Sequence, residues 1–419
     1  MSQPEWIPTA CNLCYANCGV LVQLDDDGRS IIRVKGDKAH PASKGYTCNK
    51  ALALDYYQNG RDRIMTPLKR NPEGGFDPIT YDQAFSEIAE KLKAIEAAHG
   101  PARTLYYGGG GQGNHLGGSY AGATMRALGI RYRSNALAQE KTGLGWMNER
   151  MLGGMWHGDF DQCDIALIIG KNPWQSNGMQ RARIHMRQIS KANDRMLVVF
   201  DPRRTETADL ADVHFAVEPG RDTWLIGAIL GHMVQNNLHD ADWLAAHADG
   251  WEKAVAELAE IPVADYAAFA GVPLDDVIRV AEAMGRTDKI AVYEDLGTEM
   301  APNSTLCTYM NILLFLIPGA FAKEGGTHVT APLQSIYSYG ASSGEVDEDG
   351  FEQGYKTSPV TGARILTGLI PCNSLPDEIL TDHPDRFRAM ICETANPAHS
   401  LADSQRMKEA FLSLELMVV

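Results

Sequence analysis

Four cysteines near the N-terminus constrain this chain more than any other feature of its sequence. Cys11, Cys14, Cys18 and Cys48 follow the pattern C-x2-C-x3-C-x29-C. Residues 20–24 and 31–34 alternate as strands do, around an Asp-rich turn at 25–28, and this predicts a hairpin that returns Cys48 toward the other three. Iron–sulfur clusters require soft thiolate ligands, and four of them hold a [4Fe-4S] cluster. The pattern therefore predicts such a cluster.

Two other metal-binding patterns compete with this interpretation. A structural zinc site would favour paired C-x2-C knuckles, and the C-x3-C step makes zinc the minority alternative. Radical-SAM enzymes use three cysteines in the reverse order, C-x3-C-x2-C, so both the order and the fourth cysteine speak against them. The remaining cysteines lie in apolar contexts, which is typical of buried inert thiols: Cys163, Cys307, Cys372 and Cys392.

Charge and the N-terminal residues narrow the possible partners and compartment. The 419 residues carry 53 acidic and 38 basic side chains, a formal net charge of -15, which argues against nucleic acid or an anionic membrane as the main partner. The N-terminus has no basic and apolar leader and no twin-arginine pair, and the longest apolar run, near 312–321, is too short to span a bilayer. We therefore expect a cytoplasmic protein without membrane insertion.

From Tyr81 onward the sequence alternates between helical and strand patterns. Residues 81–98 have helical periodicity, and short apolar runs predict strands at 104–107, 165–169, 196–200, 290–293, 389–392 and 415–419. Strands separated by helices indicate an α/β fold with doubly wound parallel sheets. The predicted fold class is thus a small cysteine-bearing domain followed by two related doubly wound α/β domains, one of them discontinuous.

An internal repeat links the two predicted α/β domains. The strand at 165–169 is followed by Asn172-Pro-x-x-Ser176, and the strand at 389–392 by Asn396-Pro-x-x-Ser400. Each motif predicts a helix N-terminus beyond the carboxyl end of a strand, where phosphates and nucleotides bind. Alternatively, Asn-Pro is only a turn and the serine only a cap. The repetition favours a shared binding role.

At this point the chain resembles the dimethyl sulfoxide reductase family of molybdopterin enzymes, which includes formate dehydrogenases and nitrate reductases. The resemblance covers essentially the whole chain. Its motifs, beyond the cysteines, are Cys48-Asn49-Lys50, Gly170-Lys171-Asn172-Pro173, Asp201-Pro202-Arg203-Arg204-Thr205, Ala211-Asp212, Glu218-Pro219-Gly220-Arg221-Asp222, Glu324-Gly325-Gly326 and Asn396-Pro397.

The resemblance implies a molybdenum or tungsten ion held by two molybdopterin guanine dinucleotides. It places one dinucleotide among Asn172, Asp201, Arg203, Thr205, Gly220 and Asp222, and the other near Asn396. The residue types agree, since Arg203 can bind phosphate bidentately and Gly220 permits a close approach of the backbone. Taken alone, Asp201-Pro202 could be a turn and Arg203 a solvated charge. We predict that Asn172, Asp201, Arg203 and Asp222 line one crevice.

Two further residues have catalytic roles by resemblance. The family often has a lysine where Lys50 stands, between cluster and pterin, where its charge would favour arrival of an electron at the cluster; the alternative is a solvated lysine. Many members supply a Cys, selenocysteine or Ser ligand to the metal from the segment that corresponds to 134–145, which has no cysteine here. Either Glu140 or Thr142 contributes an oxygen, or the metal has no protein ligand. Equally, Glu140 and Lys141 could form an ion pair at a helix start.

This departure puts formate dehydrogenase and periplasmic-type nitrate reductase activity in doubt. A second departure is length. In the family a further β-rich, dinucleotide-binding domain follows, and the counterpart of Asp201 in the second repeat would fall beyond Val419. We therefore expect either a fragment or split gene, or a degenerate relative without catalysis.

The resulting prediction is a molybdopterin-dependent oxidoreductase that acts on a small molecule by two-electron chemistry and passes electrons through its cluster. Its partner would be an electron-carrier protein or an iron–sulfur or flavin subunit. The expected domains are 1–62 with the cluster, 63–133 plus 290–419, and 134–289. The alternatives are a non-catalytic iron–sulfur electron-transfer subunit without pterin, and a zinc-binding scaffold.

Overall fold

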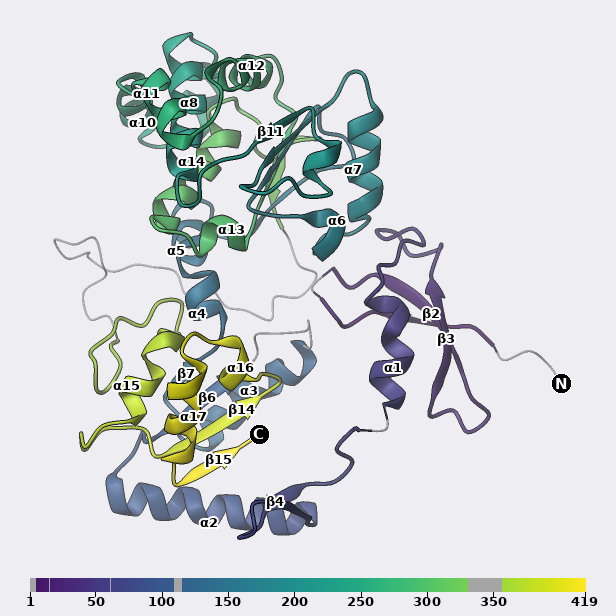
Figure 1. Ribbon diagram of the computed structural model, residues 1–419, viewed down its shortest axis with the longest axis vertical. Helices are drawn as coiled ribbons and strands as arrows, with labels where there is room; N and C mark the ends of the chain where they lie inside the picture. Colours follow the sequence, from purple (N-terminus) through teal and green to yellow (C-terminus); the bar gives the residue numbers. More distant parts are fainter. Residues whose placement is uncertain (1–4, 15, 61, 109–114, 331–355) are drawn as a thin grey trace. The chain divides into compact units, whose positions relative to one another are not determined.

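A computed structural model (Figure 1) describes residues 5–14, 16–60, 62–108, 115–330 and 356–419. Its contacts divide the chain into two compact units. Unit 1 comprises Met1–Gln139 and Glu345–Val419, and unit 2 comprises Glu140–Gly344. Unit 1 is therefore discontinuous, because unit 2 is inserted into it.

The N-terminal part of unit 1 is a three-stranded antiparallel sheet in the order β1-β2-β3. Its elements are β1 (Ile7–Ala10), β2 (Gly19–Leu24), β3 (Ile31–Gly36), η1 (Ala51–Ala53) and α1 (Leu54–Asn59). The predicted hairpin is confirmed as β2 and β3. Its turn is held by Asp25, whose Oδ1 accepts the N–H groups of Arg29 and Ser30 at 3.0 Å each. Val20, Val22, Cys11 and Ala51 form a small core beneath it.

The rest of unit 1 is built around a four-stranded parallel sheet in the order β15-β14-β6-β7. Its strands are β6 (Thr104–Gly108), β7 (Tyr132–Ser134), β14 (Ala389–Glu393) and β15 (Leu416–Val418). The other elements are β4 (Leu68–Arg70), β5 (Phe76–Pro78), α2 (Tyr81–His99), α3 (His115–Ala127), α4 (Leu137–Glu140), η3 (Cys372–Ser374), α15 (Leu375–Ile379), α16 (Pro397–Ser400) and α17 (Ser404–Leu412). Leu105, Tyr107 and Met390 pack on α15 and α17 in the core.

Unit 2 contains a second four-stranded parallel sheet, in the order β11-β10-β9-β12. Its strands are β9 (Ile165–Ile169), β10 (Met196–Phe200), β11 (Val213–Phe215) and β12 (Ile290–Glu294), with a separate antiparallel pair of β8 (Trp156–Gly158) and β13 (Thr327–Val329). Its helices are α5 (Thr142–Met151), α6 (Pro173–Ser176), α7 (Ala182–Lys191), η2 (Ala208–Leu210), α8 (Asp222–Gln235), α9 (Ala241–His247), α10 (Trp251–Ala259), α11 (Val263–Ala270), α12 (Leu274–Met284), α13 (Leu296–Glu299) and α14 (Ser304–Leu316).

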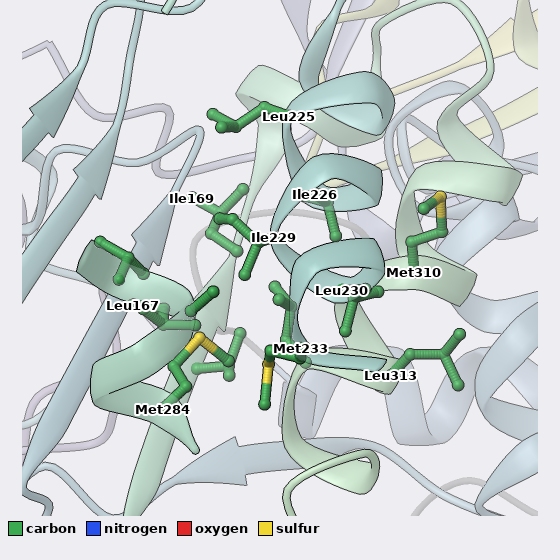
Figure 2. Packing of buried hydrophobic residues seen from close by; sticks show 14 of the residues in the cluster. Leu167, Ile169, Leu225, Ile226, Ile229, Leu230, Met233, Met284, Met310 and Leu313 are labelled. Atoms are coloured by element: carbon green, nitrogen blue, oxygen red, sulfur yellow. The ribbon is translucent and has the colours of Figure 1, made fainter. Parts of the chain in front are cut away.

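Helices cover both faces of the unit 2 sheet, as its apolar strands require. Alternate residues of a strand point to opposite faces. Leu167 and Ile169 accordingly join the core beneath α8, α12 and α14, whereas Ala166 and Ile168 join the core beneath α7. Figure 2 shows Ile226, Ile229, Leu230 and Met233 of α8 packed among these apolar side chains. Both faces are thus buried, and functional groups are left to the sheet edge where the strands end.

The predicted fold class is confirmed, with two parallel doubly wound sheets and a discontinuous first unit. One predicted boundary differs. Residues 290–344 were expected to continue unit 1, but β12 pairs with β9 along its whole length and lies in unit 2. The reason is the return of the chain after α12 to the free side of β9, which the strand pattern alone does not reveal. The separate domain at 1–62 stays a prediction.

No helix in the described parts of the chain is long and apolar enough to cross a bilayer.

Candidate functional site

The four N-terminal cysteines carry free thiols that influence one another electrostatically. The loop that contains three of them is closed by the Cys11 N–H, which donates to the Cys18 carbonyl at 2.9 Å. Burial, and after it the neighbouring thiols of Cys14, Cys48 and Cys11, raise the pKa of the Cys18 thiol to about 11. Each of the other three is therefore close enough to Cys18 to interact with it electrostatically.

The chemistry of the donor set fits an iron–sulfur cluster, because soft thiolates are the ligands that such clusters require and four of them hold a [4Fe-4S] centre. Across the described residues, no group of three or more His, Cys, Asp or Glu side chains is arranged to hold a single metal ion.

Lys50 lies beside this centre. Burial is the largest cause of the raised pKa of the Cys11 thiol, and the thiols of Cys14 and Cys48 add to it. The positive charge of Lys50 has a smaller effect, which lowers this pKa. Sequence reasoning missed two other residues here, Ser43 and His40. The Ser43 hydroxyl accepts the N–H of Gly19 at 3.1 Å and lies 3.0 Å from Nδ1 of His40, so the pair fixes the peptide that follows Cys18. A Cβ at Gly19 would lie 2.4 Å from the His40 ring, which is why glycine stands there.

In unit 2 the predicted nucleotide residues lie on loops at the carboxyl edge of the parallel sheet. Asn172 follows β9, Asp201 follows β10, and Asp222 begins α8 after β11. The order β11-β10-β9-β12 means that the chain reverses its direction of sheet growth between β9 and β12. Such a switch point at the carboxyl ends of parallel strands is where α/β folds bind ligands.

Asn172 joins two of these loops. Its side-chain amide donates to Oε2 of Glu206 at 2.7 Å, and its Oδ1 accepts the Thr207 hydroxyl at 2.6 Å. Thr207 also accepts the N–H of Trp174 at 3.2 Å, so the loop after β10 is tied to the start of α6. The side chain thereby shapes the edge, and the residues that hold it, Glu206 and Thr207, were missed by the sequence analysis.

Asp201, Arg203 and Thr205 shape the loop after β10. Oδ1 of Asp201 accepts the Arg203 N–H at 2.9 Å, which leaves the exposed Arg203 guanidinium at the surface. Thr205 is buried, and its hydroxyl accepts the N–H of Ala208, the first residue of η2, at 3.2 Å. The structure thus assigns Thr205 a local backbone role.

Gly220 and Asp222 shape the approach to α8. Gly220 has φ of +80°, which favours glycine, and a Cβ there would lie 3.4 Å from Pro302. Asp222 is 7% exposed. Burial raises the pKa of its carboxyl to about 6, and the charge of Asp201 contributes in the same direction. The two carboxyls therefore face each other across the edge, where a bound donor or cation would relieve their repulsion.

The corresponding edge of unit 1 carries Asn396 after β14. Its backbone has φ of -125° and ψ of 79°, close to the values of -115° and 81° at Asn172. In both motifs the serine hydroxyl donates to the asparagine carbonyl at 3.0 Å. Within the described residues, however, the Asn396 amide makes no side-chain hydrogen bond.

Between β9 and β12 lies a buried ion network that the sequence analysis did not find. The Asp295 carboxylate binds both Lys141, at 2.9 Å, and Lys171, and Lys141 also binds Glu299. A Cβ on Gly297 would lie 2.6 Å from Cα of Gly170, so the loops after β9 and β12 touch through two glycines. In the sequence, the one hint of this ion network was the position of Lys171 next to Asn172 in the Gly170-Lys171-Asn172-Pro173 motif.

The network decides between two interpretations of Glu140. Lys141 bonds to Asp295 and Glu299, so the alternative of a simple Glu140–Lys141 ion pair does not describe its contacts. Burial raises the pKa of the Glu140 carboxyl, and the charge of Lys141 partly offsets this. In the described chain, Glu140 has no hydrogen bond or ion pair.

Comparison with known proteins gives two family matches that together span nearly the whole chain. The family described as molybdopterin oxidoreductase matches residues 63–419, and the molybdopterin oxidoreductase Fe4S4 domain matches residues 4–60.

Individual proteins agree with these matches. The chain is 28% identical over 77% of its length to a nitrate reductase of Symbiobacterium thermophilum, covering 44% of that protein. It is 26% identical over 99% of its length to the F420-dependent formate dehydrogenase subunit alpha of Methanocaldococcus jannaschii, covering 61% of it. The solved structure of acetylene hydratase from Pelobacter acetylenicus has a TM-score of 0.80 at 20% identity, over 98% of this chain and 60% of that one. The chain thus spans about half of the length of these relatives.

Proposed function

Since the chain belongs to the molybdopterin oxidoreductase family, we propose that it acts in a molybdenum- or tungsten-dependent oxidoreductase as the catalytic chain, and that a small molecule gains or loses two electrons there. The proposal rests on the set of four neighbouring thiols at Cys11, Cys14, Cys18 and Cys48. The same chain has two parallel sheets, and an Asn-Pro-x-x-Ser motif follows a strand of each. A cluster and a two-sided cofactor site are the parts that such chemistry requires.

In this proposal the pterin cofactor has the bis(guanine dinucleotide) form. One dinucleotide lies at the unit 2 edge, with Asn172, Asp201, Arg203, Thr205, Gly220 and Asp222 around it, and the other lies near Asn396. The metal and pterin supply the two-electron chemistry, and the protein orients them. Arg203 suits a phosphate, because its guanidinium is exposed at the sheet edge. Asn172 and Thr205 act indirectly here, since their side chains hold the loop in shape.

The cluster passes electrons singly to a partner, either an electron-carrier protein or an iron–sulfur or flavin subunit. Lys50 supports this role because its positive charge favours an added electron at the neighbouring thiolates. In this proposal the Glu140 carboxyl contacts the substrate or binds the metal. Its carboxyl is half-buried without an ion pair among the described residues, whereas Lys141 is taken up by Asp295 and Glu299.

Metal analysis of the anaerobically purified chain tests the proposal. We expect about four irons per chain, a paramagnetic signal on reduction, and molybdenum or tungsten when the cofactor is supplied. Cys14→Ser should lose the iron, whereas Cys163→Ser, at a buried thiol that contacts Arg195, should keep it. Iron without molybdenum or tungsten under all conditions would identify the non-catalytic electron-transfer alternative. Stoichiometric zinc without iron would refute both.

A further inference from the structure

Two carboxyl side chains at the end of β12 are buried and each has one oxygen without a partner. Glu294 is 5% exposed and Glu299 is 4% exposed. Oε1 of Glu294 accepts the Thr308 hydroxyl at 2.7 Å, and Oε2 of Glu299 binds Lys141. Within the described residues, Oε2 of Glu294 and Oε1 of Glu299 have no hydrogen-bond partner. Buried polar atoms normally have one, so these two oxygens require an explanation.

Charge balance explains the first of them. The network contains two cations, Lys141 and Lys171, and these already bind the carboxylates of Asp295 and Glu299. Among the described residues, the direct partners of Glu294 are the neutral side chains of Thr308 and Asn311. A buried charge without a counter-ion is strongly disfavoured, and such a group becomes neutral instead. Glu294 therefore carries a proton, and its hydroxyl needs an acceptor.

Glu299 supplies that acceptor. Glu299 is five residues further along, at the end of α13, and its free oxygen is buried in the same interior. We propose that Glu294 and Glu299 hold one proton between them and form a buried proton reservoir behind the Lys141–Asp295–Lys171 ion network.

The electrostatics of the surroundings agree. Burial raises the pKa of Glu294 to about 8, with the charge of Glu299 as the next cause. Burial also raises the pKa of Glu299 to about 7, against the opposing charge of Lys141. Such a pair titrates as a unit, in two steps that belong to both groups.

One cation acts on Glu294, since the charge of Lys141 lowers its pKa, but this influence is smaller than that of the Glu299 charge, which raises it. From α14 come Thr308, Asn311 and Cys307, and the charges of Glu294 and Asp222 add to burial in raising the pKa of the Cys307 thiol. Lys141 reaches the site from the start of α5, and Lys171 from the end of β9, through Asp295. The proton is thus retained by burial and by mutual repulsion of the carboxyls.

The use of this reservoir rests on the proposed function, because two-electron reactions of small molecules commonly take up or release protons. The proton itself does not depend on a bound cofactor. Infrared spectroscopy of the full chain can detect it, since a protonated carboxylic acid has a carbonyl band that ionised carboxylates lack and that moves in deuterium oxide.

We expect such a band in the wild-type chain at neutral pH, and its loss in Glu294→Gln. The decisive variant is Glu299→Gln, which removes the neighbouring charge and keeps the shape of the side chain. If the proton is shared, Glu299→Gln should lower the midpoint of the band's titration by about one pH unit or more. The control is Glu282→Gln, at an exposed residue paired with Arg286, which should change nothing.

The absence of the band from the wild-type chain at neutral pH would refute the proposal. An unchanged midpoint in Glu299→Gln would refute the sharing of the proton and leave a protonated Glu294 alone. Because these results concern the proton and not the cofactor, they are independent of whether molybdenum or tungsten binds. Failure of the metal analysis and failure of the infrared test are thereby distinguishable.

Discussion

The two Asn-Pro-x-x-Ser motifs have the same backbone but different surroundings. In unit 2 the Asn172 side chain binds Glu206 and Thr207, which belong to the loop after the adjacent strand β10. In unit 1 the adjacent strand is β15, and Asn396 makes no side-chain hydrogen bond within the described residues. The same local sequence is thus a structural clamp in one unit and an available polar group in the other.

A second difference lies two residues before each asparagine. Gly170 has φ of +62° directly after β9, and Thr394 has φ of +51° directly after β14. A left-handed conformation is unremarkable for glycine but strained for a β-branched residue. Unit 2 therefore makes its turn with a relaxed glycine that also touches Gly297, whereas unit 1 keeps a strained threonine. The two edges therefore share a topology but differ in their contacts: the described residues hold the Asn172 side chain and do not hold that of Asn396.

The largest expected effect tests the close contact at the switch point of unit 2. Gly297→Ala places a Cβ 2.6 Å from Cα of Gly170, where only backbone could move aside. We expect a loss of about 3 kcal/mol in the stability of unit 2. Six of the seven tryptophans lie in unit 2, so fluorescence during urea unfolding follows this unit.

Gly108→Ala should resemble Gly297→Ala in size, since its Cβ would lie 2.8 Å from the Glu393 carbonyl oxygen at the switch point of unit 1. Gly122→Ala, in α3 of the same unit, is its matched control, because its Cβ would meet only the Arg126 guanidinium at 3.7 Å. A wild-type stability of Gly297→Ala would show that the two loops do not touch.

The next effect concerns the buried carboxyl of Asp222 at the unit 2 edge. Its pKa is raised from 3.8 to about 6, so the folded state keeps a proton that the unfolded state has released. For this group alone, stability should therefore fall by about 2–3 kcal/mol as pH rises from about 4 to about 6. The raised pKa values of Glu294 and Glu299 should extend the fall to about pH 8. Asp222→Asn should reduce the slope between pH 4 and 6, as measured by urea unfolding at a series of pH values. An identical slope in the variant would place the titrating group elsewhere.

The contrast between the two asparagines gives a smaller effect. Asn172→Ala removes both hydrogen bonds of the clamp, and we expect a loss of about 1–2 kcal/mol in unit 2. Asn396→Ala should change the stability of unit 1 by less than about 0.5 kcal/mol, because no such bonds are lost. Amide hydrogen exchange in β9 and β14 would report each unit separately. Equal losses of stability in the two variants would show that the two asparagine side chains contribute equally to their units.

The smallest effect has the opposite sign. Thr394→Gly relieves the strain of a left-handed threonine but adds the backbone freedom of glycine to the unfolded chain. The balance should stabilise unit 1 by about 0.5–1 kcal/mol. Slower hydrogen exchange in β14 would confirm it, whereas a loss of stability would mean that the threonine side chain holds a contact worth more than the strain.

Much of this architecture was accessible from local sequence. The hairpin of β2 and β3, the helix α2 and six strands of the two sheets follow from periodicity, because strands and helices have different spacings of apolar residues. The short edge strands β7 and β11 were not predicted. The repeat correctly predicted two like turns at Asn172 and Asn396. The place of β12 was not accessible, because a strand pattern does not state its neighbour.

The four N-terminal cysteines could be recognised as a metal-binding set before the fold was known, because thiols at this spacing have few possible uses and the hairpin between them is local. Which polar groups contact one another depends on the fold. Lys141 is adjacent to Glu140 in sequence, yet it binds Asp295 and Glu299, more than 150 residues away. Likewise the raised pKa of Glu294 comes from its burial and from the nearby charge of Glu299, which stands five residues away in sequence. Charge states of buried groups depend on distance and solvent exclusion, and these exist only once the chain has folded.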